Sequence, residues 1–349
     1  MAEAPPPPPG VPPPPPPPFI TLHTSADVDS MYRSLASASA SASASVPSYH
    51  PWLPYLRTHS NDRPPLVRLF CFPWAGAGAS AYGVWQRRFT SGELDDGKAG
   101  LNKIDGEGPS KITGAKHVQL CAVQMPGREH RANEAPCENL KQAARDFVRD
   151  CKELLASARV AFFGHGCGSW MAYEVALEMR RNGMADPVLL VVSNWPAPQT
   201  PLNARPWRRV DALDNDELIR EGRLWGWPEH IFREDFWPYI EPSIRADQRF
   251  FDTYEPIGVE EPLSCPIVAY VSQDDPKFGP RKGTPEFLEA WARLSTRMHM
   301  EIECWNGDHY YLQDEKLRHK VAKSVARRVA DIAQLIADMQ DDDGGDDDE

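Results

Sequence analysis

The residues best suited to chemistry in this chain are a glycine-rich turn, a carboxylate and a histidine, in that order. The segment Val160-Ala-Phe-Phe-Gly-His-Gly-Cys-Gly168 predicts a buried strand that runs into a tight turn and then a helix. Asp275 comes just after another apolar run, and His309 after a third. A nucleophile on a strand-to-helix turn, then an acid, then a histidine is one chain order that serves acyl transfer. The spacing therefore predicts acyl-transfer chemistry at a site shared by the turn, Asp275 and His309.

These residues need a common scaffold, and the apolar pattern predicts one. Short runs rich in β-forming residues alternate with helical stretches, and one later run alternates with period two. The predicted strands are 67–72, 118–124, 160–163, 188–193, 267–272 and 300–304. Apolar residues four apart predict helices over 171–179, with Gly183 as a stop, and over 317–329. Such alternation predicts the α/β class, with a mostly parallel central sheet and helices on both faces.

The two ends of the chain differ in composition from its middle. Residues 1–62 are predicted to be a disordered Pro-rich and Ala/Ser-rich extension, because prolines and the Ala-Ser repeat at 36–45 offer no apolar face. Residues 1–18 should form polyproline II, the conformation that proline-binding modules recognise, although a flexible extension is the simpler interpretation. Residues 339–349 are predicted to be a solvated acidic tail.

The predicted folded domain spans residues 63–338 and carries two interruptions. Residues about 90–116 are rich in Gly, Asp, Lys and Ser and predict an inserted surface loop. Residues about 207–254 predict a helical lid between two strands. This lid contains Trp207, Trp225, Trp227 and Trp237. Core packing and a substrate channel are equally good explanations of these tryptophans.

Composition excludes several classes of function. The chain has 349 residues and a net charge of −12, so it offers nothing to offset the repulsion of nucleic-acid phosphates. No apolar run is long enough for a membrane span, and the proline-rich start is unlike a secretory signal. Seven cysteines without paired spacing favour a reduced compartment and core roles, which predicts a cytoplasmic protein. Organelle targeting is the open alternative, because residues about 30–60 are rich in serine and poor in acids, although the preceding proline tract argues against it.

The glycines at 164, 166 and 168 raise a second interpretation, dinucleotide binding. That fingerprint needs G-x-G-x-x-G and an acid at the end of the next strand. Ser169 occupies the place of the third glycine, and the run 188–193 ends in serine without an acid. The signal for a nucleotide is therefore weak. Since no Walker lysine and no metal-ligand cluster stand out either, no cofactor and no metal are predicted.

Five collinear blocks of this sequence resemble the type II thioesterases, which include the stand-alone fatty-acyl chain-terminating enzymes. The blocks are Cys71-Phe-Pro-Trp-Ala-Gly76, Gln124-Met-Pro-Gly-Arg-Glu-His-Arg131, Phe163-Gly-His with Gly168-Ser169, Pro242-Ser-Ile-Arg-Ala-Asp247 and Gly307-Asp-His-Tyr-Tyr-Leu312. Together they cover about residues 66–335. Each block alone is a weak signal, whereas five in the same order are specific.

The resemblance implies a role for each matching residue. His309 would be the general base, and Asp275 would hold its imidazole; Asp274 competes for that place, but Asp275 precedes the proline as in the family. Ala75 and Cys167 would donate backbone N–H groups to the oxyanion. Two residues near Ala75 depart from the family's motif: Trp74 stands where the family usually has a histidine, and Ala77 where it has a glycine. These departures predict an oxyanion hole of altered shape.

The main departure is Gly166, which stands where the family has its nucleophilic serine. Glycine suits a turn with positive φ but has no side chain with which to attack. Three substitutes are open: Cys167, Ser169, or a water molecule activated by His309. Cys167 is better explained as core and Ser169 as a capping or packing residue. His165, inside the same motif, is better explained by packing than by chemistry.

The resemblance thus implies an α/β-hydrolase fold with an inserted helical lid. It implies acyl thioesters on the phosphopantetheine arm of a carrier protein as ligands, and release of fatty or stalled acyl chains in fatty-acid, polyketide or nonribosomal synthesis. Because of Gly166, activity would be weak or lost. The alternative is a non-catalytic protein that binds acyl groups or their carrier.

Overall fold

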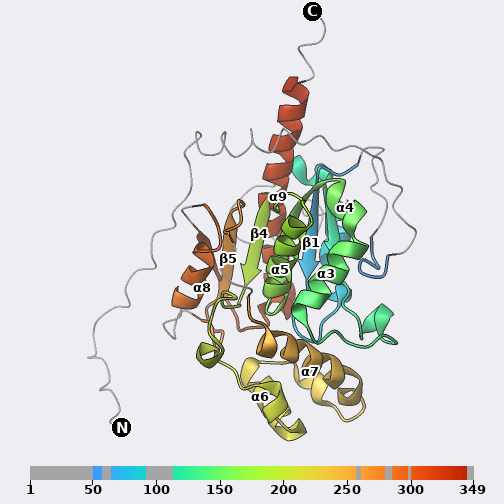
Figure 1. Cartoon of the computed structure of the whole chain (residues 1–349). Helices are drawn as coiled ribbons and strands as arrows, with labels where there is room; N and C mark the ends of the chain where they lie inside the picture. Colours follow the sequence, from blue (N-terminus) through green and yellow to red (C-terminus); the bar gives the residue numbers. More distant parts are fainter. Residues whose placement is uncertain are drawn as a thin grey trace, which may run out of the picture. The chain divides into compact units, whose positions relative to one another are not determined.

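The computed structural model describes residues 50–56, 64–91, 113–256, 261–279, 285–297 and 300–343 (Figure 1). The predicted polyproline segment, the Ala-Ser repeat and residues 92–112 of the predicted insertion lie outside the described residues, as do the last six residues of the acidic tail. No helix in the described ranges is both long and apolar enough to cross a membrane.

The described residues fold around a six-stranded sheet in the order β2-β1-β3-β4-β5-β6, in which every pairing is parallel. Its strands are β1 Val67–Phe72, β2 Val118–Ala122, β3 Arg159–His165, β4 Leu189–Ser193, β5 Ile267–Ser272 and β6 Glu301–Trp305. The apolar runs of β1, β2, β4 and β5 are buried along their whole length, as expected for strands covered on both faces. The predicted α/β class with a parallel sheet is confirmed.

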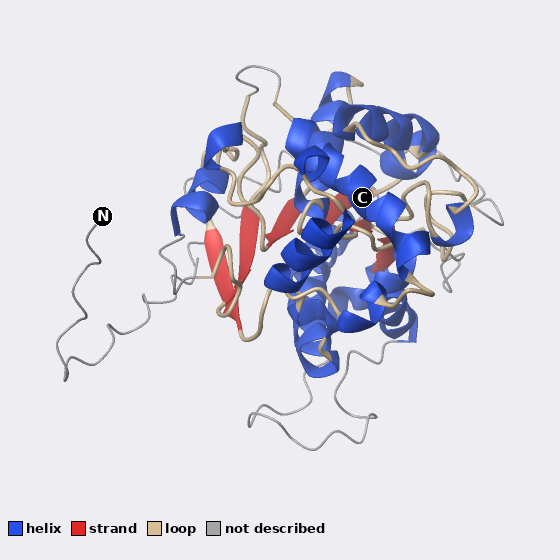
Figure 2. Ribbon diagram, turned by 90° about the horizontal axis from the view of Figure 1, so that it is seen from below, coloured by secondary structure: helices blue, strands red, loops and turns tan. Residues whose placement is uncertain are grey.

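Helices cover both faces of the sheet, as the view from below shows (Figure 2). Those outside the lid are α2 Gly83–Ser91, α3 Leu140–Asp150, α4 Lys152–Ala156, α5 Gly168–Arg181, α8 Pro285–Ala292 and α9 Glu315–Asp343. Short 3₁₀ helices are η1 Ala79–Tyr82, η2 Thr113–His117, η3 Glu129–Arg131 and η8 Tyr311–Gln313. Helix α5 contacts α3 on one face of the sheet, while α9 contacts α2 on the other.

The strand order reverses between β1 and β3, the place where open α/β sheets form a crevice at their carboxyl ends. The segment between β4 and β5 lies beyond this edge (Figure 1) and contains the residues predicted as a lid. Its elements are η4 Leu202–Ala204, η5 Val210–Ala212, α6 Asn215–Trp225, η6 Glu229–Phe232 and α7 Trp237–Thr253. A capping box formed by Asp214 and Glu217 starts α6, and Gly226 at φ +82° ends it.

The predicted extension is too long at its carboxyl end. Trp52 and Leu53 fall within residues 1–62, yet they are only 2% and 1% exposed. The Trp52 ring packs edge-on against Phe147 of α3, and its Nε1 donates to a carboxylate oxygen of Asp150 at 2.9 Å. The segment Pro51-Trp-Leu-Pro-Tyr-Leu56 is apolar, but two prolines interrupt it and it has neither a helix nor a strand period, so the burial of Trp52 and Leu53 could not be read from the local sequence.

The predicted boundaries of the surface insertion and of the acidic tail also differ from those in the structure. The described part of the insertion is structured, because α2 continues to Ser91 and η2 begins at Thr113. Gly114 of η2 lies so close to α9 that a Cβ there would sit 1.9 Å from the carbonyl oxygen of Ala330. Helix α9 continues to Asp343, past residue 338, so the first residues of the predicted tail are helical.

Candidate functional site

The turn between β3 and α5 is held tightly by glycines. A Cβ at Gly164 would lie 2.4 Å from the carbonyl oxygen of Gly168, and one at Gly168 would lie 2.4 Å from that of Phe72. Side chains at these two positions would therefore open the turn. Gly166 at its apex has φ +55°, a conformation that costs an L-residue about 1–2 kcal/mol.

The apex of this turn faces the histidine predicted as the base. A Cβ built at Gly166 would lie 3.7 Å from His309 Nε2, with the nearest other atoms at 3.4 Å (Trp74 Cβ) and 4.0 Å (Trp195 Cε3). These are ordinary van der Waals distances, so the position has room for a small side chain. A hydroxyl carried there would come within hydrogen-bonding reach of the imidazole.

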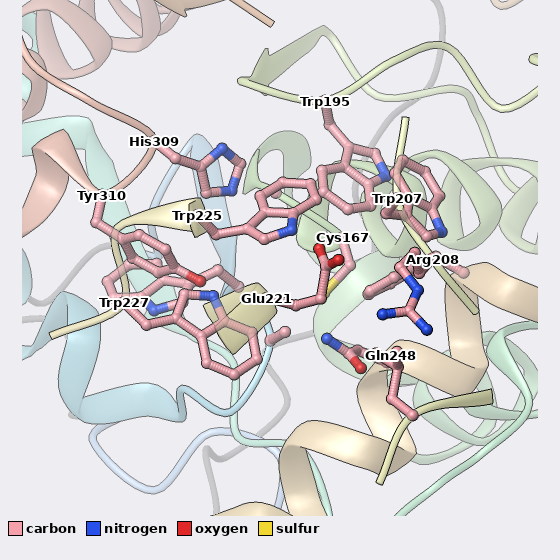
Figure 3. A pocket seen from close by; sticks show the side chains of 15 residues that line it. Cys167, Trp195, Trp207, Arg208, Glu221, Trp225, Trp227, Gln248, His309 and Tyr310 are labelled. Atoms are coloured by element: carbon pink, nitrogen blue, oxygen red, sulfur yellow. The ribbon is translucent and has the colours of Figure 1, made fainter. Parts of the chain in front are cut away.

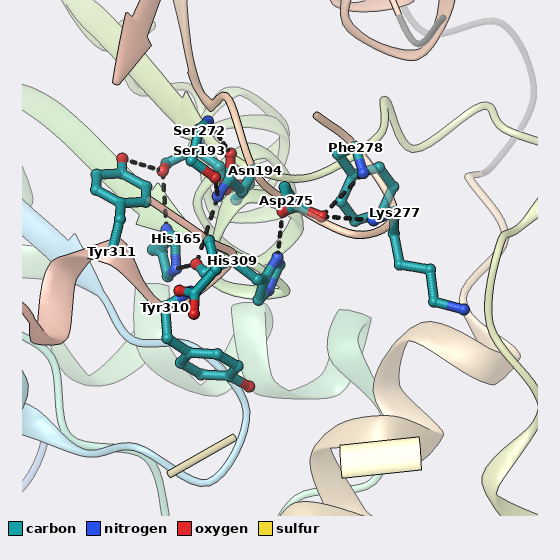
Figure 4. Close-up of polar contacts among 12 residues, drawn as sticks. His165, Ser193, Asn194, Ser272, Asp275, Lys277, Phe278, His309, Tyr310 and Tyr311 are labelled. Atoms are coloured by element: carbon teal, nitrogen blue, oxygen red, sulfur yellow. Dashed lines mark hydrogen bonds and ion pairs between the residues drawn. The ribbon is translucent and has the colours of Figure 1, made fainter. Parts of the chain in front are cut away.

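The structure brings His309 together with Asp275 (Figure 4). His309 Nδ1 lies 2.7 Å from Asp275 Oδ2, and each residue is 2% exposed. Asp275 Oδ1 accepts the backbone N–H groups of Lys277 at 2.8 Å and Phe278 at 2.9 Å. The neighbouring Asp274 is exposed.

The carboxylate of Asp275 is suited to stay charged. Burial raises its pKa, but the nearby His309 and the hydrogen bonds it accepts outweigh this and hold the pKa below its ordinary value. A charged Asp275 favours the proton on Nδ1 of His309. The other ring nitrogen, Nε2, is then free to accept a proton on the side that faces Gly166.

His165 supports the backbone of His309 rather than facing the pocket. Its Nε2–H donates to the carbonyl oxygen of His309 at 2.9 Å, which makes Nδ1 the acceptor for the Ser193 hydroxyl at 2.8 Å. Ser193 Oγ lies 2.7 Å from the Tyr311 hydroxyl, which completes a buried chain of hydrogen bonds (Figure 4). Burial, together with His309, holds the pKa of His165 well below its usual range, so this ring is neutral.

The residues predicted to form the oxyanion hole lie at the same edge of the sheet. Ala75 follows β1 and Cys167 follows Gly166, and both line the pocket. In the described part of the chain, neither backbone N–H donates to a backbone carbonyl. The loop after Ala75 is fixed, because Gly76 N–H donates to Asp247 Oδ2 at 2.8 Å and Ala77 N–H donates to the Trp74 carbonyl at 3.0 Å.

The side chains of Cys167 and Ser169, the two other nucleophile candidates, differ in their surroundings. Burial, and to a smaller extent Asp247, raises the pKa of the Cys167 thiol well above its ordinary value, which disfavours the nucleophilic thiolate. The Ser169 hydroxyl donates to the carbonyl oxygen of Gly164 at 2.8 Å, inside the turn and away from the pocket lining. Neither side chain is placed like an activated nucleophile.

A pocket of about 480 Å³, including space open to solvent, lies between the turn and the lid (Figure 3). Five tryptophans line it, namely Trp74, Trp195, Trp207, Trp225 and Trp227. Trp225 packs edge-on against the His309 ring at 5.0 Å, so α6 contacts the predicted base directly. Trp237 is buried elsewhere and does not line the pocket.

Trp195 is a pocket residue that the sequence gave little reason to select. It stacks on Trp207 with ring centroids 4.9 Å apart and lies 6.2 Å from the His309 ring. Its position two residues after β4, at the carboxyl edge of a parallel sheet, was the available signal. In the described residues, no group of three or more His, Cys, Asp or Glu side chains could hold a metal ion.

Known proteins resemble this chain in sequence and in fold. Residues 110–331 match the family model described as the thioesterase domain. The chain is 30% identical to the gramicidin S biosynthesis protein GrsT of Aneurinibacillus migulanus, over 72% of this chain and 84% of that protein. It is 26% identical to the human S-acyl fatty acid synthase thioesterase, medium chain, over 77% and 89% of the two chains. Among solved structures, the RedJ thioesterase of the prodiginine pathway in Streptomyces coelicolor is similar with a TM-score of 0.60 and 26% identity, covering 78% of this chain and 95% of RedJ.

Proposed function

This chain belongs to the thioesterase domain family, and on that premise we propose that it acts on acyl thioesters presented on the phosphopantetheine arm of a carrier protein. Two similar proteins are named as a gramicidin S biosynthesis protein and as a fatty acid synthase thioesterase, which supports synthase-bound acyl chains as the substrate class. The reaction would be hydrolysis to a free acid and a thiol. Its rate would be low, because Gly166 supplies no nucleophile.

In the proposed mechanism, water takes the part that serine plays in a triad. His309 Nε2 removes a proton from the water, whose oxygen attacks the thioester carbonyl carbon. The N–H groups of Ala75 and Cys167 stabilise the oxyanion, and Asp275 stabilises the imidazolium. The attack gives a tetrahedral intermediate. When this intermediate collapses, the C–S bond breaks and His309 returns its proton to the departing thiolate. The products are a carboxylic acid and the carrier's thiol.

One observation carries this proposal: the Nε2 of His309 lies 3.7 Å from the Cβ position of residue 166, while Nδ1 is bonded to Asp275. A buried carboxylate on Nδ1, with Nε2 turned toward the place of the reacting group, is the arrangement in which an imidazole acts as a general base. Triad enzymes that lose one member still retain roughly 10³-fold catalysis over water, which sets the expected level of activity.

A second candidate function is binding without turnover. The observation in its favour is that the pocket and its aromatic walls are retained while the nucleophile is not. Such a protein would hold an acylated carrier and protect or deliver its acyl chain. It would need neither His309 nor Asp275 for that task.

The test compares wild type with Gly166→Ser and Gly166→Ala on acylated carrier protein, with released thiol as the readout. Alanine is the matched control, because it adds the same Cβ at φ +55° without a hydroxyl. We expect serine to raise hydrolysis by at least about a hundredfold and alanine not to raise it. If the serine variant is no faster than the alanine variant, the rest of the site is not competent for hydrolysis.

A variant of the base then separates the two candidates. Slow hydrolysis by wild type that disappears in His309→Ala supports water activation by the imidazole. Tight binding of acylated carrier with no turnover above background, unchanged by His309→Ala, supports the binding function instead. Hydrolysis by wild type that survives His309→Ala would contradict the proposed mechanism.

A further inference from the structure

The wall of the pocket includes a carboxylate, that of Glu221 on α6. The side chain is half-buried, and Figure 3 shows its carboxylate directed inward, among the aromatic side chains. In the part of the chain that the structure describes, the two oxygens form no hydrogen bond and no ion pair, and they are not sealed inside the protein. A ligand in the pocket can therefore reach a charged acceptor that no described side chain neutralises.

The cations nearest to this part of the pocket have other contacts. Arg208 also lines the pocket, but its Nη2 donates to Oε1 of Glu217 at 3.0 Å. The Nζ of Lys277 lies 5.7 Å from the centre of the Trp225 ring, and Lys277 is not part of the pocket lining. Since Glu217 balances Arg208, Glu221 leaves the lining with an uncompensated negative charge.

Aromatic rings surround the carboxylate on the lid side of the pocket. Trp207 and Trp225 both line the pocket, with ring centroids 6.4 Å apart and ring planes inclined by 51°. The face of an indole attracts cations more strongly than any other aromatic side chain does. A carboxylate beside two indoles is thus an environment that favours a positively charged group.

Glu221 lies close to the reacting centre. It stands four residues before Trp225 on α6, so the two side chains share one face of the helix and are about 6 Å apart along its axis. The Trp225 ring in turn lies 5.0 Å from the His309 ring. The carboxylate is therefore about one helical turn away from the residue that contacts the predicted base.

Building on the function proposed above, we propose that Glu221 recognises a protonated amine on the acyl chain of the bound thioester. The ammonium would donate to the carboxylate, and the indoles of Trp207 and Trp225 would stabilise its charge. A plain alkyl chain would instead strip water from Glu221 and leave the charge without a partner, which costs binding free energy. The pocket thus favours aminoacyl thioesters over simple fatty acyl thioesters.

The amine must belong to the acyl chain, because the pantetheine arm has amides and hydroxyls but no basic nitrogen. It could stand on the α-carbon, next to the thioester carbonyl, or at the far end of the chain. The chemistry at Glu221 is the same in both cases. Acyl chains that carry the amine at only one of these places distinguish them.

The test measures binding, so that it does not depend on turnover. The ligands are acyl-pantetheine analogues with NH in place of the thioester sulfur, which prevents hydrolysis. Their acyl groups are octanoyl, α-aminooctanoyl, ω-aminooctanoyl and the α-hydroxy and ω-hydroxy counterparts. Each hydroxyl matches an amine in size and can donate a hydrogen bond, but it has no charge. Affinities are measured by calorimetry with the full-length protein at about pH 6.5, below the pKa of both amines.

Wild type is compared with Glu221→Gln and Asp216→Asn. Glutamine keeps an oxygen acceptor at nearly the same size, so this substitution removes only the charge of Glu221. Asp216→Asn is the matched control, because Asp216 is an exposed acid on the same helix that does not line the pocket. Thermal melting of each variant shows that it is folded before its affinities are compared.

We expect one of the amines to bind wild type about tenfold more tightly than its hydroxyl counterpart and than octanoyl, as hydrogen bonds between charged groups provide. Glu221→Gln should lose this preference, and Asp216→Asn should keep it. A preference for α-aminooctanoyl places the amine next to the thioester, and one for ω-aminooctanoyl places it at the end of the chain.

Equal affinities of wild type for octanoyl and both amines would overturn the proposal while leaving the proposed function intact. The same holds if a hydroxyl binds as tightly as its amine, or if the preference for an amine survives in Glu221→Gln. Loss of the preference in Asp216→Asn would also overturn it, since the net charge of the lid would then be the cause. No binding of any analogue would contradict the proposed function itself, and the amine proposal with it.

Discussion

Asp247 Oδ2 accepts the backbone N–H of Gly76 at 2.8 Å, which joins the lid to the loop of the proposed oxyanion hole. Asp247 lies on α7 and is bonded through both oxygens to Arg128, which also donates to the carbonyl oxygen of Ala77. Both charged side chains are 6% exposed. A single buried ion pair therefore ties together the lid, the segment after β2 and the loop after β1.

Breaking this pair in a Gly166→Ser background should reduce both stability and catalysis. In Asp247→Leu, the charge of Arg128 stays buried without its partner, which costs about 3–5 kcal/mol of unfolding free energy. Gly76 also loses the acceptor of its N–H, so the donor at Ala75 is no longer held in place. We expect kcat to fall by about a hundredfold, the effect of losing one oxyanion-hole donor, and KM to change less.

The double variant Arg128→Met/Asp247→Leu separates the two effects. Replacing a whole buried pair by apolar residues of similar volume is often neutral or stabilising, so the melting temperature should recover. The rate should not recover, because Gly76 still lacks its acceptor. If kcat returns together with stability, the Asp247–Gly76 bond does not position the hole.

The scaffold could be predicted from the sequence because its signals are local. Parallel strands buried on both faces appear as continuous apolar runs, and their carboxyl ends meet at one edge. This is why a histidine and an aspartate 34 positions apart could be expected to meet, and in the structure His309 and Asp275 are 2.7 Å apart. The turn at Gly166 could be located for the same reason, since it follows directly after a clear strand.

The pocket walls depend on tertiary packing and left little local trace. Trp207, Trp225 and Trp227 line the pocket while Trp237 does not, although all four lie in the same tryptophan-rich segment. Which of them face the site depends on how the lid helices lie against the sheet. The burial of Trp52 likewise depends on the surface of α3, which lies about a hundred residues farther along the chain.

The neutral state of His165 predicts a pH dependence of stability. Its pKa is held well below the usual 6.5 in the folded protein, so the unfolded chain binds a proton near pH 6 that the folded protein does not. The contribution of His165 to the free energy of unfolding is thus fully present above about pH 6.5 and declines as the pH falls below that value. The slope approaches about 1.4 kcal/mol per pH unit for one proton.

Denaturant unfolding of wild type and His165→Gln between pH 7.5 and 5.5 measures this contribution. Glutamine can hydrogen-bond but does not titrate, so the difference between the two proteins should shrink as the pH falls. A difference that stays constant across this range would show that His165 binds a proton equally well in the folded state.

The charged carboxylate of Asp275 predicts how an amide in its place would change catalysis. In Asp275→Asn on the Gly166→Ser background, the amide N–H would donate to Nδ1 of His309 and leave the proton on Nε2. The imidazole could then no longer act as the base, and kcat should fall by up to about 10⁴-fold, as in other triads with the wrong tautomer. Asp274→Asn is the matched control, because Asp274 is the exposed neighbour of the buried Asp275. Comparable losses of kcat in Asp275→Asn and Asp274→Asn would mean that Asp275 does not orient the base.

The same substitution tests how Asp275 contributes to stability. Because the pKa of Asp275 is lowered in the folded state, its contribution to stability is present above about pH 3.9 and lost as the pH falls through its folded pKa. At pH 7.5 the Asn variant should therefore melt at a lower temperature than its parent, and the gap should narrow toward pH 3.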